Sequence, residues 1–162
     1  MTVDLRPFTG DDIALLLSWV GSSSAMRLWA GDAFRWPLDE AQLAAYLAET
    51  RTPGRRSWTT WDGRGQAVGH ASLRVDFPAR SGRLGRVLIA PQARRRGLAG
   101  EMLRQVLEVA FGDVGLRRLE LGVYSDNVAA VRLYERMGFV ADDQPGADEC
   151  RQRVVHMTLD AQ

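Results

Sequence analysis

Hydrophobic positions change their spacing along the chain, and each spacing predicts a type of element. Residues 2–6 alternate between polar and apolar, as in a short strand. Two segments then follow a helical spacing, one over residues 11–20 and one beginning at Asp39. Their apolar stripes are Ile13, Leu16, Leu17 and Val20 in the first and Leu43, Tyr46 and Leu47 in the second. Between them, residues 25–37 are expected to be irregular.

The rest of the chain reads as strands separated by two helices. Strand patterns separated by turn signals are predicted at 57–61, 66–77, 84–89, 116–124, 139–140 and 153–159. The predicted helices cover 97–111 and 127–137, and Gly138 is placed to end the second. This order predicts an α/β or α+β domain built around one central sheet.

Length and composition fit a single globular domain over residues 1–162. Apolar residues make up 46% of the chain, and no run approaches the roughly 18 residues that would span a bilayer. We therefore expect no membrane partner. The first residues show no basic segment followed by an apolar one, and Cys150 is the only cysteine. A cytoplasmic location is expected.

The charge pattern excludes several kinds of chemistry. All 21 basic residues are arginines, so neither a Schiff-base lysine nor a phosphate-loop lysine is available. The formal net charge is only +1, which does not favour a nucleic-acid partner. The histidine, cysteine and acidic residues show no metal-ligand spacing, so no metal is expected.

The segment from Val87 to Gly100 predicts an anion site. A strand that ends near Ile89 leads into three arginines and then into a helix that begins at Gly97. The start of a helix has unpaired N–H groups and the positive end of the helix dipole, and small residues let an anion approach the backbone. The alternative is a basic helix start whose small residues serve packing.

A second segment, Ser125 to Phe139, places polar side chains on one helix face. Asn127 and Tyr134 are seven residues apart, close to two turns, and Ala130 lies between them on that face. This face leaves room for a ligand to lie along the helix. The alternatives are an N-cap role for Asn127 and a core role for Tyr134, packed against Phe139.

Together the two segments resemble the GNAT superfamily of N-acetyltransferases. Arg94-Arg95-Arg96-Gly97-Leu98-Ala99 is similar to its acetyl-CoA signature, although many members have glycine where this chain has Arg95 and Ala99. The run from Asn127 to Phe139 is similar to its second motif at nearly every defined position. The resemblance implies a mixed, mostly antiparallel central sheet of about six to seven strands flanked by four helices.

The resemblance also implies roles for individual residues. It implies that the turn containing Arg94, Arg95, Arg96, Gly97, Leu98, Ala99 and Gly100 holds the pyrophosphate of acetyl-CoA. Leu88 and Ile89 would offer backbone hydrogen bonds to the pantetheine arm, which Asn127 would also contact. Tyr134 would donate a proton to the departing thiolate.

The general base and the acceptor are less defined. Glu120 is a possible base, on the strand face that also carries Gly122 and Tyr124. Trp29, Phe34 and Trp36 could form an aromatic wall for an amine, or could be core residues. We expect a primary amine of a small molecule as acceptor. A protein amino group, or a non-catalytic acyl-CoA-binding module, are the alternatives. The protein could be a monomer or a homodimer.

Overall fold

A computed structural model describes residues 2–142 and 154–162, and its centre is a seven-stranded sheet in the order β1-β2-β3-β4-β5-β7-β6. Neighbouring strands are antiparallel except β4 and β5, which are parallel. The strands are β1 (Val3–Pro7), β2 (Arg55–Asp62), β3 (Ala67–Asp76), β4 (Ser81–Ile89), β5 (Arg118–Tyr124), β6 (Val140–Ala141) and β7 (Val154–Asp160).

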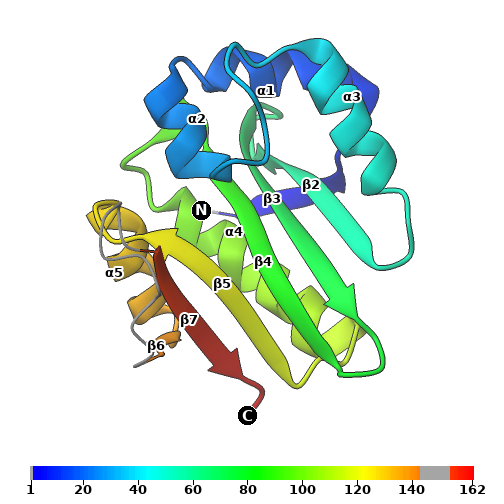
Figure 1. The fold of residues 1–162 in the computed structure, drawn as a ribbon, viewed down its shortest axis with the longest axis vertical. Helices are drawn as coiled ribbons and strands as arrows, with labels where there is room; N and C mark the ends of the chain where they lie inside the picture. Colours follow the sequence, from blue (N-terminus) through cyan, green and yellow to red (C-terminus); the bar gives the residue numbers. More distant parts are fainter. Residues whose placement is uncertain (1, 143–153) are drawn as a thin grey trace.

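Five α-helices surround this sheet: α1 (Ile13–Trp19), α2 (Ser23–Ala30), α3 (Glu40–Glu49), α4 (Leu98–Leu107) and α5 (Val128–Arg136). Figure 1 shows α1, α2 and α3 gathered at one end of the molecule and α4 passing behind the sheet. A π-helical turn, Glu108–Asp113, extends α4. The predicted α/β class and mostly antiparallel sheet are confirmed.

The expectation of an irregular segment over residues 25–37 is wrong for its first part. Ser22 accepts a hydrogen bond from the backbone N–H of Ala25 over 3.1 Å and thereby starts α2. The serine run at residues 22–24, which follows the first predicted helix, therefore begins a further helix. This is the fifth helix where four were expected. Arg153, the predicted first residue of the last strand, and Cys150 lie outside the described residues.

The two faces of the sheet carry different side chains because neighbouring residues of a strand point to opposite faces. On β3, a Cβ atom at Gly69 would lie 3.1 Å from Met102 of α4, so Gly69 faces α4. The next residue, His70, faces the opposite side, where its Nε2 lies 2.9 Å from the hydroxyl of Tyr46 on α3. We call this second side the α3 face.

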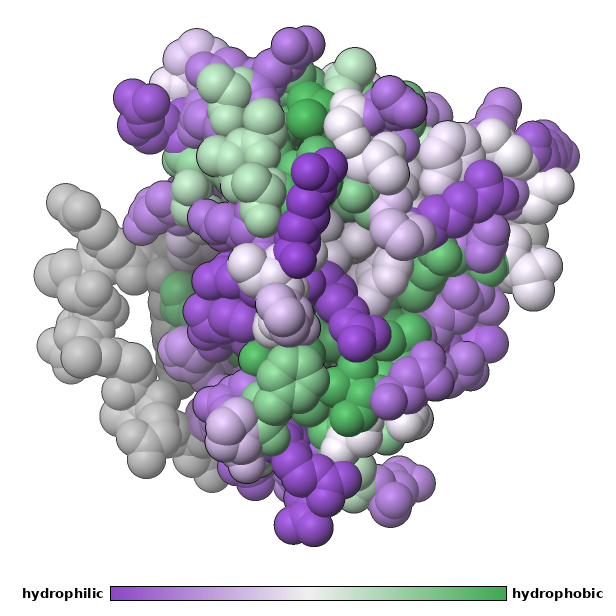
Figure 2. Space-filling model, turned by 90° about the vertical axis from the view of Figure 1, so that its right-hand side faces the viewer, coloured by the Kyte–Doolittle hydropathy of each residue, from purple (hydrophilic) through white to green (hydrophobic). Residues whose placement is uncertain are grey.

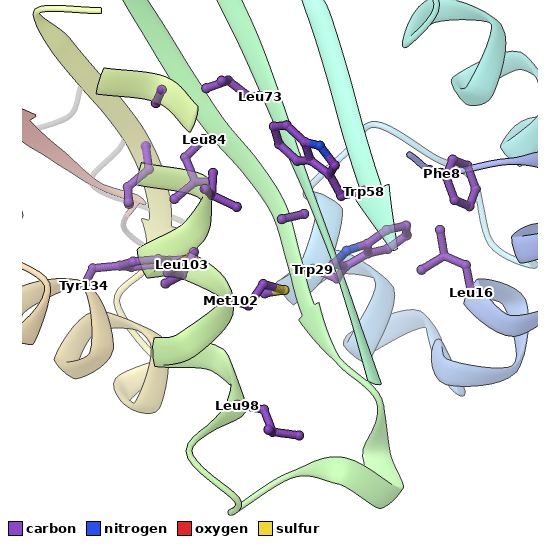
Figure 3. Close-up of a cluster of buried hydrophobic side chains, with 14 of the residues drawn as sticks. Phe8, Leu16, Trp29, Trp58, Leu73, Leu84, Leu98, Met102, Leu103 and Tyr134 are labelled. Carbon is purple, nitrogen blue, oxygen red and sulfur yellow. The ribbon is translucent and has the colours of Figure 1, made fainter. Parts of the chain in front are cut away.

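Buried hydrophobic side chains pack on the α3 face of the sheet and on the opposite face, which α4 covers. Figure 3 shows Phe8, Leu16 and Trp29 at one end of this buried cluster and Leu103 and Tyr134 at the other. On the surface, seen from the right-hand side of Figure 1, hydrophilic residues separate smaller hydrophobic patches (Figure 2). Within the described residues, none of the helices has the length and apolar character needed to cross a membrane.

Candidate active site

Two parallel strands separate to open the main cleft. β4 pairs with β5 only from Ser81 to Arg83, opposite Arg118 to Glu120. Beyond Arg83 both strands continue without pairing to each other, and Figure 1 shows them diverging. Beyond Arg83 this edge of β4 therefore has no strand partner and can bond a ligand laid along it, as in strand addition, although the oxygens of Arg86 and Ile89 already accept side-chain hydrogen bonds.

A bulge in β4 shapes the floor of this opening. Ser72 of β3 lies opposite Gly85, whereas His70 lies opposite Leu88, so β4 has one residue more than β3 in this stretch. Within the bulge Arg86 has a left-handed backbone, with φ of 48°. Bulges bend a strand and redirect its side chains, and here the bulge lies where the two strands separate.

The cleft has a volume of about 870 Å³ and is bounded by β4, β5, α5, α2 and the start of α4. Its lining includes the predicted residues Leu88, Ile89, Arg94, Arg95, Gly97, Ala99, Gly100, Asn127, Tyr134 and Trp29. Among the residues that the structure describes, four arginines and no aspartate or glutamate line it. The cleft therefore suits a long ligand that carries negative charge.

The start of α4, where the sequence predicts an anion site, has the geometry that such a site requires. Gly97 occupies the N-cap position with φ of 73°, a left-handed conformation that favours glycine, and no side chain caps the helix. A Cβ atom at Gly97 or Gly100 would meet no other atom within 4 Å. The N–H groups of the first turn are thus left for a ligand at the end of the cleft.

The three arginines before Gly97 have different positions. Arg94 and Arg95 line the cleft, and Nε of Arg94 donates to the backbone oxygen of Ile89 over 3.4 Å. Arg96 forms an ion pair with Asp62 at 3.3 Å and does not line the cleft. Leu98 is buried in the core. The arginine run thus serves both the cleft and the attachment of this turn to the β2–β3 connection.

Tyr134 packs in the core and also lines the cleft. Its ring packs against Phe139 with centroids 5.8 Å apart, and Figure 3 shows it pointing from α5 toward Leu103 of α4. It also lines the cleft, and within the described chain its hydroxyl makes no hydrogen bond. Burial raises the pKa of Tyr134 to about 12, so the phenol keeps its proton at neutral pH.

Asn127 occupies the N-cap position of α5, yet its side chain makes no capping hydrogen bond. It lines the cleft one residue before the helix that carries Tyr134. The N-cap alternative therefore does not occupy the amide group, and the side chain is available to a ligand.

Of the remaining predicted residues, only Trp29 lines the cleft. Glu120 is exposed on β5, opposite Arg83, and does not line the cleft. Trp29 does line it, and its ring stacks on Phe34 with centroids 5.5 Å apart. Phe34 and Trp36 are not among the lining residues, and Trp36 is 45% exposed.

A second pocket, which the sequence analysis missed, lies on the α3 face. It has a volume of about 350 Å³ and shares Leu84, Gly85, Arg86, Gly122 and Val123 with the cleft. The two spaces therefore meet at the separation of β4 and β5. The arginines of this pocket come from β2, β3 and β4, and only the register of the sheet brings them together. In the described part of the chain, no three His, Cys, Asp or Glu residues are grouped to hold a metal ion.

These features define a mixed-sheet domain with a cleft between two separated parallel strands and a second pocket beside it. Comparison with known proteins identifies the family. Residues 23–139 match the family model described as acetyltransferase (GNAT) family. The chain belongs to this family of N-acetyltransferases, and the predicted membership is confirmed.

Individual relatives support the same family. The chain is 35% identical over 125 residues to the uncharacterized N-acetyltransferase YedL of Escherichia coli (strain K12), covering 74% of this chain and 76% of that protein. It is 26% identical over 153 residues to the aminoglycoside N(6')-acetyltransferase type 1 of Klebsiella pneumoniae, covering 85% and 74%. A crystal structure of spermidine N-acetyltransferase from Vibrio cholerae in complex with CoA and spermine has a TM-score of 0.84 at 21% identity, covering 98% and 95%.

Proposed function

We propose that the protein transfers an acetyl group from acetyl-CoA to a primary amine of a small molecule, by direct attack within a ternary complex. One observation carries the proposal: the cleft joins an uncapped helix start to Tyr134 and meets a second pocket where β4 and β5 separate. A nucleotide thioester and an amine could thus enter from two sides and meet there. Relatives that act on aminoglycosides or spermidine support a small amine as acceptor.

The cleft fits acetyl-CoA by its chemistry as well as its size. The N–H groups at Gly97, Ala99 and Gly100, with Arg94 and Arg95 beside them, would hold the pyrophosphate. The unpaired edge of β4 at Leu88 and Ile89 would bond the amides of the pantetheine arm. When bound, acetyl-CoA supplies a thioester carbonyl for attack.

Tyr134 is the proton donor in this proposal. The amine nitrogen forms a bond to the acetyl carbon, the carbon–sulfur bond breaks, and the Tyr134 phenol gives its proton to sulfur. The phenol then regains a proton from water, which takes the one released by the amine. The raised pKa of Tyr134 keeps the donor protonated at neutral pH.

The amine must be neutral when it attacks, and its ordinary pKa is about 10.4. Among the described residues, the second pocket is lined by five arginines and by no aspartate, glutamate or histidine. Positive charge around an ammonium group lowers its pKa, because like charges disfavour the charged form. We propose that this environment promotes loss of the proton to water. The role of Glu120 as a general base stays a prediction. Its side chain is exposed and does not line this pocket.

The test is thiol release from acetyl-CoA by the wild type and by Tyr134→Phe. Removing the hydroxyl is expected to lower kcat about 100-fold, the lower end for general acid catalysis, while the Kd for acetyl-CoA changes less than about threefold. Phe139→Leu is the control, because it changes the packing of the Tyr134 ring and keeps the hydroxyl. Equal kcat values for wild type and Tyr134→Phe would refute the role of Tyr134.

A further inference from the structure

We propose, on the basis of the function proposed above, that the acceptor carries a carboxylate or phosphate group besides its amine, and that arginines of the second pocket bind this anion. The acceptor would thus be an amino acid or an aminoalkyl phosphate rather than a polyamine or an aminoglycoside. The register of the sheet, the surroundings of Arg86 and the place of Arg83 each support this proposal.

Three arginines lie in a row across neighbouring strands. Arg55 of β2 is opposite Arg74 of β3, and Arg74 is opposite Arg83 of β4. All three lie on the α3 face, two positions along their strands from Ser57, Ser72 and Gly85, which form the next row. Like charges placed directly opposite in a sheet are unfavourable, so a row of three needs an opposing charge.

Few carboxylates among the described residues lie close enough to these three arginines to neutralise their charge. Glu49 lies 3.4 Å from Arg55 at the edge of the sheet. Glu120 is opposite Arg83 at the other end of the row, and with Asp76 it lines a different pocket from the second pocket. No ion pair of Arg74, Arg83 or Arg86 occurs within the described chain, and no carboxylate lines the second pocket. An anion bound in the pocket would supply the missing negative charge.

Arg86 stands at the other end of the pocket, inside the bulge of β4. The centre of its guanidinium group lies 4.8 Å from the ring centroid of Tyr46 and 5.6 Å from that of Phe34. Its Nε is buried and has no hydrogen-bond partner among the described residues. A buried donor without a partner is costly to a folded protein, and a carboxylate or phosphate oxygen would satisfy it.

A glycine on β5 makes room for the guanidinium group of Arg83. A Cβ atom at Gly122 would lie 2.9 Å from Nη2 of Arg83 and 3.3 Å from a methyl group of Val154. Gly122 lines both the second pocket and the cleft. Arg83 therefore reaches across from β4 to the place where the two spaces meet. An anion held between Arg83 and Arg86 would keep an attached amine close to the thioester.

The positive charge of the second pocket distinguishes this protein from relatives that are named after polycationic substrates. Spermidine and aminoglycosides carry several positive charges, and five lining arginines would repel them. An amine with an anionic group gains attraction from the same arginines. The volume of about 350 Å³ suits a small acceptor of this kind.

The experiment compares acceptors that differ in one charge. Thiol release from acetyl-CoA is measured with a set of amino acids and with their carboxamides, with phosphoethanolamine and ethanolamine, and with spermidine and kanamycin. We expect kcat/KM to be at least about 10-fold higher for an anionic amine than for its neutral partner, with the polycations lowest. The amino acid and phosphate arms show which anion is preferred.

Variants then assign the preference to the pocket. Arg83→Gln and Arg86→Gln are expected to raise KM for the anionic acceptor about 10-fold or more, with less than about a threefold change in KM for acetyl-CoA. Arg64→Gln is the matched control, since Arg64 lies exposed in the β2–β3 turn and loses the same charge. Arg83 is exposed, so Arg83→Gln keeps the test valid if the half-buried Arg86 proves necessary for folding.

The outcomes separate this proposal from the function on which it rests. Turnover of spermidine, kanamycin or neutral amines with kcat/KM equal to or above that of the anionic amines would overturn the acceptor proposal and leave the transferase proposal intact. So would unchanged KM for an anionic acceptor in both variants. Absence of acetyl-CoA binding would overturn the transferase proposal itself.

Discussion

The indole Nε1 of Trp29 donates a hydrogen bond to the backbone oxygen of Arg86 over 3.0 Å and so ties α2 to the bulge in β4. Trp29 and Arg86 both line the cleft and the second pocket, so this bond lies where the two spaces meet. The ring of Phe34 stacks on Trp29 and also lies near the Arg86 guanidinium group. The aromatic residues thus position an arginine.

Replacing Trp29 with phenylalanine tests this attachment. Trp29→Phe keeps an aromatic ring but removes the N–H donor, and we expect the free energy of unfolding to fall by about 1 kcal/mol or more. The KM for the acceptor should rise because Arg86 loses its support. Urea unfolding and steady-state kinetics measure the two effects. Trp36→Phe is the control, since Trp36 is 45% exposed and should change stability by less than about 0.5 kcal/mol.

Two glycines at the start of α4 are expected to respond differently to alanine. Gly100 lies inside α4, where alanine is favoured over glycine by about 0.5–1 kcal/mol, but its new methyl group would point into open space beside the cleft. Gly100→Ala should therefore raise Tm and weaken acetyl-CoA binding. Gly97 has φ of 73°, so Gly97→Ala should lower the free energy of unfolding by about 1 kcal/mol and weaken binding as well. Calorimetry of unfolding and of acetyl-CoA binding separates the two. A tighter acetyl-CoA complex in Gly100→Ala would contradict the assignment of this turn.

A substitution at Gly122 should affect binding of the acceptor. In Gly122→Ala the new methyl group displaces the end of Arg83, a flexible side chain, so we expect a small loss of stability and at least about a fivefold rise in KM for the acceptor. Gly63→Ala is a suitable control because a Cβ atom there meets nothing within 4 Å. An unchanged KM for the acceptor in Gly122→Ala would argue against Arg83 as an acceptor contact.

His70 makes folding stability depend on pH. Burial, and to a smaller extent the nearby Arg86, lowers the pKa of His70 from 6.5 to about 3. A depressed pKa means that the unfolded chain binds the proton more readily, so stability is complete above pH 6.5 and falls as the pH decreases toward 3. Each pH unit below 6.5 removes up to about 1.4 kcal/mol, or about 2 kcal/mol at pH 5.

Urea unfolding at pH 7 and pH 5 measures this loss. His70→Gln retains a partner for the Tyr46 hydroxyl but does not titrate in this range, so its stability should change less between the two pH values. If wild type and His70→Gln lose equal stability, His70 is not the group responsible.

The sequence was sufficient for the features that depend on neighbouring residues. The alternation of β5, the helix that begins at Gly97, and the seven-residue spacing of Asn127 and Tyr134 all depend on local periodicity, and the structure contains them. The division between α1 and α2 was not predicted, because a run of serines both ends one helix and caps the next. The side chain of Arg96 could not be placed either, since its partner Asp62 is 34 residues away.

The second pocket could not be predicted from the sequence at all, because its residues come together only in the folded sheet. Arg55, Arg74 and Arg83 lie on three strands, and their alignment requires the register of β2 with β3 and of β3 with β4. The bulge between Gly85 and Leu88 then turns Arg86 toward Tyr46. A sequence gives the alternation within each strand, but neither the register between strands nor the place of a bulge follows from it.

The most direct test of the account is thermal unfolding of the protein with acetyl-CoA, with CoA and with ATP as an unrelated nucleotide. A ligand at about 100 times its Kd stabilises the folded state by about 2.7 kcal/mol. The account predicts a clear increase in Tm with acetyl-CoA and with CoA, a much smaller one with ATP, and loss of the increase in Gly100→Ala. No increase in Tm at millimolar acetyl-CoA would contradict the claim that the separation of β4 and β5 forms an acetyl-CoA site.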